Sequence, residues 1–123
     1  MYTYRARALN VVDGDTCDLL IDVGFHMTTT QRIRLLGVNT PEMRVPEQTN
    51  REKAMAAKSF TAATLGMDRP LEQRPALLIS TEKDDAFGRW LANIEVLDDV
   101  GTKVSCLNDD LIKFGHAVPY KRK

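Results

Sequence analysis

Carboxylates are concentrated in one short stretch near the beginning of the chain. Residues 13–22 contain Asp13, Asp15, Asp18 and Asp22 but no Lys or Arg. Carboxylates at this density repel one another unless a cation lies among them, and a set of oxygen donors favours Ca²⁺ or Mg²⁺ over zinc. The spacing does not fit an EF-hand, which requires Gly where this chain has Asp18. On this segment alone, a solvated Asp-Gly turn is the favoured interpretation.

The segment from Arg34 to Glu42 carries the groups that phosphoryl chemistry requires. Arg34 offers a guanidinium that can hold two phosphate oxygens. Asn39 and Thr40 offer oxygen ligands for a metal ion, and Glu42 offers a carboxylate that can accept a proton from water. The structural alternative is an ordinary turn opened by Thr-Pro-Glu.

Three arginines fall where strands are expected. Arg32 and Arg34 are two residues apart, so a strand would place both on the same face of a sheet. The fold must then either solvate these two cations or use them. Arg89 follows Gly88 at the start of another expected strand, where it is either a second phosphate ligand or a surface cation at a hairpin.

The elements that must position these residues follow from apolar patterning and turn signals. Thr49 and Glu52 have the spacing of a capping box, and Gly66 ends the helix that they begin. Helices are absent after most strands, which excludes a parallel α/β sheet. We therefore expect a mainly β (α+β) fold, an antiparallel five-stranded Greek-key barrel of the OB type. The expected order is strands at 2–12, 17–23 and 28–38, a helix at 49–65, strands at 76–80 and 90–97, and a C-terminal helix at 107–114.

Composition limits the function further. A length of 123 residues predicts a single domain over 1–123. Lys and Arg number 17 and Asp and Glu number 17, and this balance excludes a generally basic nucleic-acid coat protein. Charge that binds a polyanion must therefore be local: residues 32–58 carry a net charge of +3 and residues 95–110 a net charge of −4.

Other features bear on compartment and redox chemistry. Cys17 and Cys106 have no zinc spacing and are expected in the core, with a disulfide between them left open. No apolar run approaches the ~20 residues of a membrane span. The beginning of the chain lacks the apolar stretch of a signal peptide, so a cytoplasmic location is favoured over a mature secreted form.

Four short blocks, spread over nearly the whole chain, occur together in a specific order. Any one of them is a weak signal, but the four in sequence resemble the staphylococcal nuclease (thermonuclease) family over residues 13–117. The blocks are Asp13-Gly14-Asp15-Thr16, then Arg34-Leu35 through Thr40-Pro41-Glu42, then Phe87-Gly88-Arg89, then Leu107-Asn108-x-x-Leu111 through Gly115-His116-Ala117.

The resemblance implies an OB barrel that acts as a calcium-dependent endonuclease. Such an enzyme hydrolyses phosphodiester bonds of DNA and RNA by in-line attack of an activated water and leaves 3′-phosphate ends. We expect single-stranded or breathing nucleic acid as the partner, no membrane partner, and a monomer. The roles implied by the resemblance are one Ca²⁺ ion bound by Asp15, Asn39 and the Thr40 carbonyl, Glu42 as general base, Arg34 and Arg89 on the scissile phosphate, and Asp13 in the outer shell of the metal.

Three positions depart from the family pattern. Asn39 replaces the usual second carboxylate on calcium, so we expect weaker metal binding, with Mg²⁺ and Mn²⁺ open as alternatives. Phe87 keeps an aromatic face for the substrate but loses the hydroxyl of a Tyr. Tyr120 is the nearest candidate for a C-terminal aromatic contact with substrate, with an alignment shifted by one residue. The alternative function is a catalytically weak or inactive OB-fold module that binds nucleic acid, for which Asn39 is the main argument.

Overall fold

Buried and exposed side chains alternate along the first strands of the protein. In the computed structural model, Cys17, Leu19 and Ile21 are buried and the residues between them are partly exposed. This period of two is what a sheet with one buried face requires. The structure describes residues 2–41, 48–84 and 89–120. The strands there are β1 (Tyr2–Asp13), β2 (Thr16–Asp22), β3 (Thr28–Leu35), β4 (Val38–Asn39), β5 (Leu77–Asp84), β6 (Arg89–Leu97), β7 (Lys103–Cys106) and β8 (Val118–Pro119).

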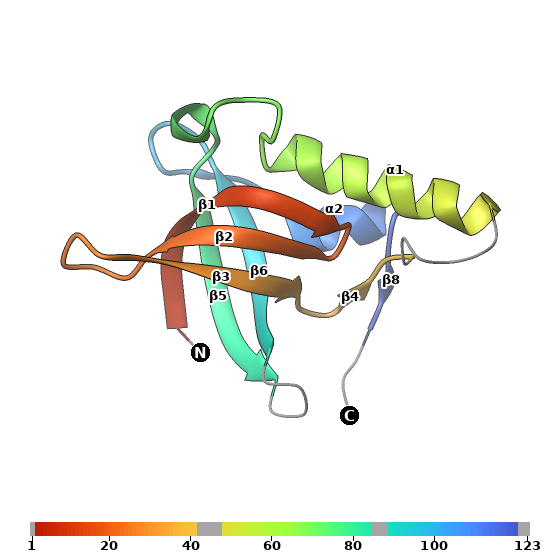
Figure 1. Cartoon of the computed structure of the whole chain (residues 1–123), viewed down its shortest axis with the longest axis horizontal. Coiled ribbons are helices and arrows are strands. Elements are labelled where there is room, and N and C mark those ends of the chain that lie inside the picture. Colours follow the sequence, from red (N-terminus) through yellow and green to blue (C-terminus); the bar gives the residue numbers. More distant parts are fainter. Residues whose placement is uncertain (1, 42–47, 85–88, 121–123) are drawn as a thin grey trace.

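Five of these strands close into a barrel (Figure 1). The order of neighbours is β3-β2-β1-β5-β6, and β3 then pairs with β6 to complete the circle, while β7 extends the sheet beyond β6. The prediction of a five-stranded OB-type barrel is confirmed. The expectation that all its strands are antiparallel is wrong for the closing pair, because β3 and β6 run parallel.

Two helices, α1 (Gln48–Thr64) and α2 (Leu107–Lys113), accompany the barrel, and a short 3₁₀ turn, η1 (Leu71–Gln73), precedes β5. Helix α1 begins at Gln48, one residue before Thr49, and the predicted capping role of the Thr49 side chain lies outside what the structure describes. Its end is as predicted. Gly66 has a φ of 75° and its N–H donates to the Ala63 carbonyl, while the Met67 N–H donates to the Ala62 carbonyl. This pair of bonds is the Schellman motif, which favours glycine.

Strand boundaries differ from the expectation in several places. The predicted strand 28–38 divides into β3 and β4, because the chain turns at Gly37 with a φ of 77°. β5 continues to Asp84 because its polar residues keep pairing with β6. β7 was not predicted, since its polar residues give no apolar alternation. The turn at Gly37 matters most, because it redirects the chain into the segment that carries Asn39 and Thr40.

The core fills the barrel and the space beneath the helices. Both cysteines are free and buried there, which confirms the prediction of core positions and answers the open question of a disulfide. Burial raises the pKa of the Cys17 thiol to about 12, so it stays protonated.

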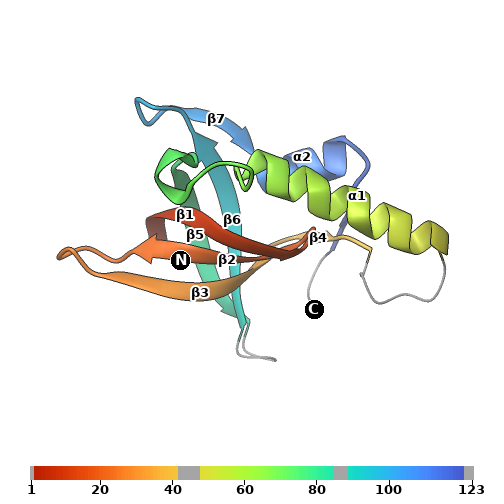
Figure 2. The same ribbon diagram turned by 45° about the horizontal axis from the view of Figure 1, so that its top comes forward.

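Figure 2 shows α1 and α2 on the same side of the barrel. The ring of Phe60 in α1 contacts the ring of Phe114, which directly follows α2, with the ring centroids 5.6 Å apart. In the described part of the chain, no helix is long and apolar enough to cross a membrane.

Candidate functional site

The tight turn between β1 and β2 is held against helix α1. A Cβ atom on Gly14 would lie only 2.8 Å from the Ala57 Cβ, so no larger residue fits here without displacement. On the same helix, the Thr61 hydroxyl donates a hydrogen bond of 2.6 Å to the Gly14 carbonyl. The glycine therefore serves a close approach of backbone to helix, and this approach fixes where the next residue, Asp15, lies.

Asp15 is almost completely enclosed, with 7% of its surface exposed. Its Oδ2 lies 3.0 Å from Nη1 of Arg34 and accepts a hydrogen bond of 3.1 Å from the Thr40 backbone N–H. Its Oδ1 accepts a hydrogen bond from the Thr16 hydroxyl. A buried carboxylate is tolerated only when its charge is paired and its oxygens are hydrogen-bonded. The contacts with Arg34, Thr40 and Thr16 meet that requirement.

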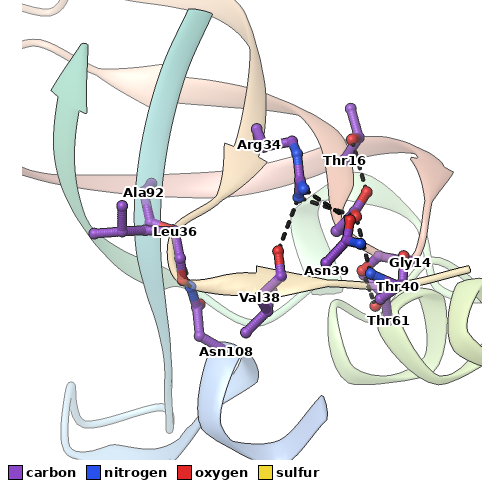
Figure 3. A network of polar contacts seen from close by, with 11 residues as sticks. Gly14, Thr16, Arg34, Leu36, Val38, Asn39, Thr40, Thr61, Ala92 and Asn108 are labelled. Carbon is purple, nitrogen blue, oxygen red and sulfur yellow. Dashed lines mark hydrogen bonds and ion pairs between the residues drawn. The ribbon is translucent and has the colours of Figure 1, made fainter. Parts of the chain in front are cut away.

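Arg34 joins the predicted site residues to one another, as Figure 3 shows. Besides its contact with Asp15, it donates to the Val38 carbonyl at 3.1 Å through Nη1 and to Oδ1 of Asn39 at 3.1 Å through Nη2. Its side chain is 15% exposed. One guanidinium therefore contacts both side chains that the sequence predicts as metal ligands, Asp15 and Asn39.

Arg32 has a different environment, although it leaves the same face of β3. Its side chain is 64% exposed and it makes two hydrogen bonds to the Asp18 carboxylate, at 2.9 Å and 3.3 Å. These bonds hold the pKa of Asp18 below its ordinary value. A pair whose cation is this exposed to solvent contributes little to stability. The prediction that the two arginines share one face is thus confirmed. The structure adds that Arg32 is solvated whereas Arg34 is enclosed.

Arginine side chains of the protein itself therefore lie beside the acidic stretch of residues 13–22. Arg34 faces Asp15 and Arg32 faces Asp18, while the Asp22 carboxylate accepts the Gly24 backbone N–H at 2.8 Å. In the described ranges, no group of three or more His, Cys, Asp or Glu side chains is placed to hold a metal ion. The donors near Asp15 are oxygens of one carboxylate and one amide. Oxygen donors of this kind fit a hard cation such as Ca²⁺, although they include only one carboxylate group.

The aromatic ring of Tyr120 lies over Arg34, with the guanidinium carbon 6.0 Å from the ring centroid. Strands β4 and β8 bring it there, because Asn39 pairs with Val118 and the Tyr120 N–H donates to the Gly37 carbonyl at 2.9 Å. The ring is half exposed. The structure thus places the ring of Tyr120 next to Arg34, while its contact with substrate stays a prediction.

The structure says less about the remaining predicted site residues. Arg89 begins β6 and is exposed, and Asp13 ends β1 opposite Thr16. Glu42 and Phe87 lie outside the described residues, so the structure does not test their predicted roles. The backbone of Thr40 meets Asp15 through its N–H, while the predicted role concerned its carbonyl.

Sequence reasoning assigned no role to Asn108, which proves to support the site. Asn108 is 3% exposed, and its Oδ1 accepts the Ile94 N–H at 3.0 Å. Its Nδ2 donates to the carbonyls of Leu36, at 2.8 Å, and Ala92, at 3.1 Å. The residue therefore ties α2 to β6 and to the turn that leads into β4. Its signal in the sequence is its place in the block Leu107-Asn108-x-x-Leu111, since the neighbouring Asp109 and Asp110 are polar as well.

Comparison with known proteins agrees with this geometry. Residues 32–123 match the family described as Staphylococcal nuclease homologue. Thermonuclease from Staphylococcus intermedius is 34% identical to the chain over 90 residues, which are 73% of this chain and 48% of that protein. The chain thus spans about half the length of the curated relative that it matches.

Proposed function

Because the chain belongs to the staphylococcal nuclease family, we propose that it hydrolyses phosphodiester bonds of single-stranded or breathing DNA and RNA and leaves 3′-phosphate ends. One observation carries the proposal: the nearly enclosed guanidinium of Arg34 is held by Asp15, Val38 and Asn39 beneath the half-exposed ring of Tyr120. A fixed guanidinium suits a phosphate, and an exposed aromatic face suits an unpaired base.

The reaction follows from the roles of the chain's own residues. Arg34 and Arg89 stabilise the negative charge that develops on the equatorial phosphate oxygens. Glu42 accepts a proton from the water that attacks phosphorus in line. The bond from phosphorus to the 5′-oxygen breaks, and this oxygen then takes a proton from solvent. The phosphate stays on the 3′-oxygen of the other fragment.

Asp15, Asn39 and the Thr40 carbonyl would hold Ca²⁺, which when bound supplies positive charge against a non-bridging phosphate oxygen. Arg34 already contacts Asp15 and Asn39, so it and an ion share the same two oxygen donors. Two cations at one carboxylate repel each other, and this repulsion weakens the affinity of the site for metal.

Glu42→Gln and Arg89→Ala are each expected to lower calcium-dependent cleavage of single-stranded DNA at least tenfold, because each removes a group that acts in the transition state. Initial rates measure the effect, and thermal unfolding checks that the variants remain folded. Glu52→Gln and Arg51→Ala, which change exposed side chains of α1, are the matched controls and should keep full activity. Full activity in both test variants would refute the assignment.

Asn39→Asp is expected to tighten Ca²⁺ binding by about tenfold, because it adds a second carboxylate beside Asp15 and strengthens the attraction for a divalent ion. Titration calorimetry with CaCl₂ measures the change. Gln73→Glu adds the same charge on the exposed 3₁₀ turn and serves as the control. An unchanged affinity in Asn39→Asp would show that residue 39 is not a ligand.

The second candidate function is a module that binds nucleic acid without cleaving it. The contact of Arg34 with both Asp15 and Asn39 favours this candidate, because a site whose donors are satisfied by an arginine has less need of a metal ion. The two functions differ in one outcome, namely whether bound single-stranded DNA is degraded when calcium is present.

A further inference from the structure

A groove of about 490 Å³ lies beside the candidate site, between helix α1 and the segment that leads from α2 to β8. Lys53 and Ala56 of α1 form one wall, and residues 115–118 form the other. Asn39, Thr40 and Pro41 close one end. Figures 1 and 2 both show α1 running past β4 and β8 at this place. The volume falls in the range of about 300–1,000 Å³ that is typical of ligand sites.

The groove is continuous with the site around Arg34. Asn39 belongs to both, because its Oδ1 accepts from Arg34 while the residue also lines the groove. Val118, opposite Asn39 in the pairing of β4 with β8, lines the groove too, and Tyr120 follows two residues later. A strand of nucleic acid that passes over Asn39 would thus have Arg34 and Tyr120 on one side and the groove on the other.

The chemistry of the walls suits a nucleotide. Among the described residues that line the groove there is no Asp or Glu, and Lys53 supplies a positive charge. Lys53 is exposed, and no ion pair links it to another described residue. His116 presents an aromatic ring that is fixed by stacking on Phe60, with centroids 4.8 Å apart. A cation for a phosphate and an aromatic surface for a base are the two parts of a single-strand site.

We propose that this groove holds the nucleotide adjacent to the scissile phosphate, on the side away from Tyr120, with Lys53 on the phosphate that follows. The inference rests on the proposed nuclease function and adds a second subsite to it. Neither the family match nor the relative assigns a role to Lys53, Ala56 or His116.

Two variants test the groove in different ways. Lys53→Ala removes the charge, and Ala56→Leu fills the space with a residue that α1 tolerates, since Leu forms helices well. Lys58→Ala and Ala63→Leu make the same changes on α1 at positions that do not line the groove. The unfolding temperatures of all four variants should match that of the wild type, so that differences in cleavage or affinity reflect binding and not stability.

The first measurement is cleavage of thymidine oligomers in the presence of calcium. For an octamer, Lys53→Ala should raise KM about fivefold with kcat within twofold, while cleavage of the dinucleotide TpT, which has no second phosphate, should not change. Ala56→Leu should raise KM for both substrates. The control variants should behave as the wild type does.

The second measurement is binding of a fluorescein-labelled octamer to the same variants in a Glu42→Gln background, followed by anisotropy as salt is varied. Loss of one phosphate contact should lower the slope of log affinity against log salt by about 0.7 in Lys53→Ala. Groove variants that match their controls in both measurements, while Arg34→Ala lowers cleavage by about 10²-fold, would refute the subsite and leave the nuclease function standing. A wild type that cleaves no substrate would refute the nuclease function and the subsite with it.

Discussion

Arg34→Ala is expected to lower calcium-dependent cleavage of single-stranded DNA by about 10²-fold, the loss typical of removing one group that stabilises transition-state charge. The variant should also lose about 3 kcal/mol of unfolding free energy, because Asp15 would remain enclosed without its cation. Initial rates and urea denaturation measure the two effects. The expected loss is smaller than the 5–15 kcal/mol of a typical domain, so the variant should remain folded.

Arg32→Ala is the matched control, because Arg32 leaves the same face of β3 two residues away and is itself exposed, although it also pairs with a carboxylate, that of Asp18. It should keep cleavage within threefold of the wild type and lower the unfolding free energy much less than Arg34→Ala does. Equal losses of activity in the two variants would show that the general positive charge of β3 matters and that the placement of Arg34 does not.

Asn108→Ala is expected to lower the unfolding free energy by about 3 kcal/mol. The Ile94 N–H and the Leu36 carbonyl would both lose their partner in Asn108, and each unsatisfied buried group costs about 1–3 kcal/mol. The Ala92 carbonyl is less affected because it also accepts the Leu36 N–H. Urea denaturation measures the change, with the exposed neighbour Asp109→Ala as the control. A loss below 0.5 kcal/mol would contradict the role assigned to Asn108.

Asn108→Asp separates hydrogen bonding from packing. The substitution keeps an acceptor for Ile94 but places a carboxylate against the Leu36 and Ala92 carbonyls. Burial and these carbonyls should raise the pKa of the new carboxyl in the folded state. Its deficit relative to wild type should therefore be large at pH 7 and shrink as the pH falls towards 4, where the protonated group can donate again. A deficit independent of pH would indicate a packing defect.

Local patterns predicted those parts of the fold that depend on neighbours in the chain. The spacing of Arg32 and Arg34 placed both on one face of β3, because side chains alternate along a strand. Gly66 ended α1 as expected because only glycine readily takes its positive φ. The motifs around Asp15, Arg34 and Asn39 also pointed to residues that the structure brings into direct contact.

Contacts between distant segments could not be predicted in the same way. For the acidic stretch alone, a solvated turn was the favoured interpretation, because the arginines that face Asp15 and Asp18 come from another strand and are not visible in the local pattern. The parallel closure of β3 on β6 and the three bonds of Asn108 likewise join segments far apart in the sequence. These features depend on tertiary packing. Local patterns indicate whether a residue lies in a helix or a strand, whereas tertiary packing determines which residues surround it.

The most direct test of the proposed nuclease function is digestion of single-stranded DNA by the unmodified protein, with Ca²⁺ or with a chelator, followed by mass spectrometry of the fragments. The expected result is fragmentation only with Ca²⁺, with each break leaving a 3′-phosphate on one fragment and a 5′-hydroxyl on the other. DNA that binds but stays intact in Ca²⁺ would contradict the nuclease function and favour the binding module, and breaks that leave 5′-phosphates would contradict the proposed chemistry.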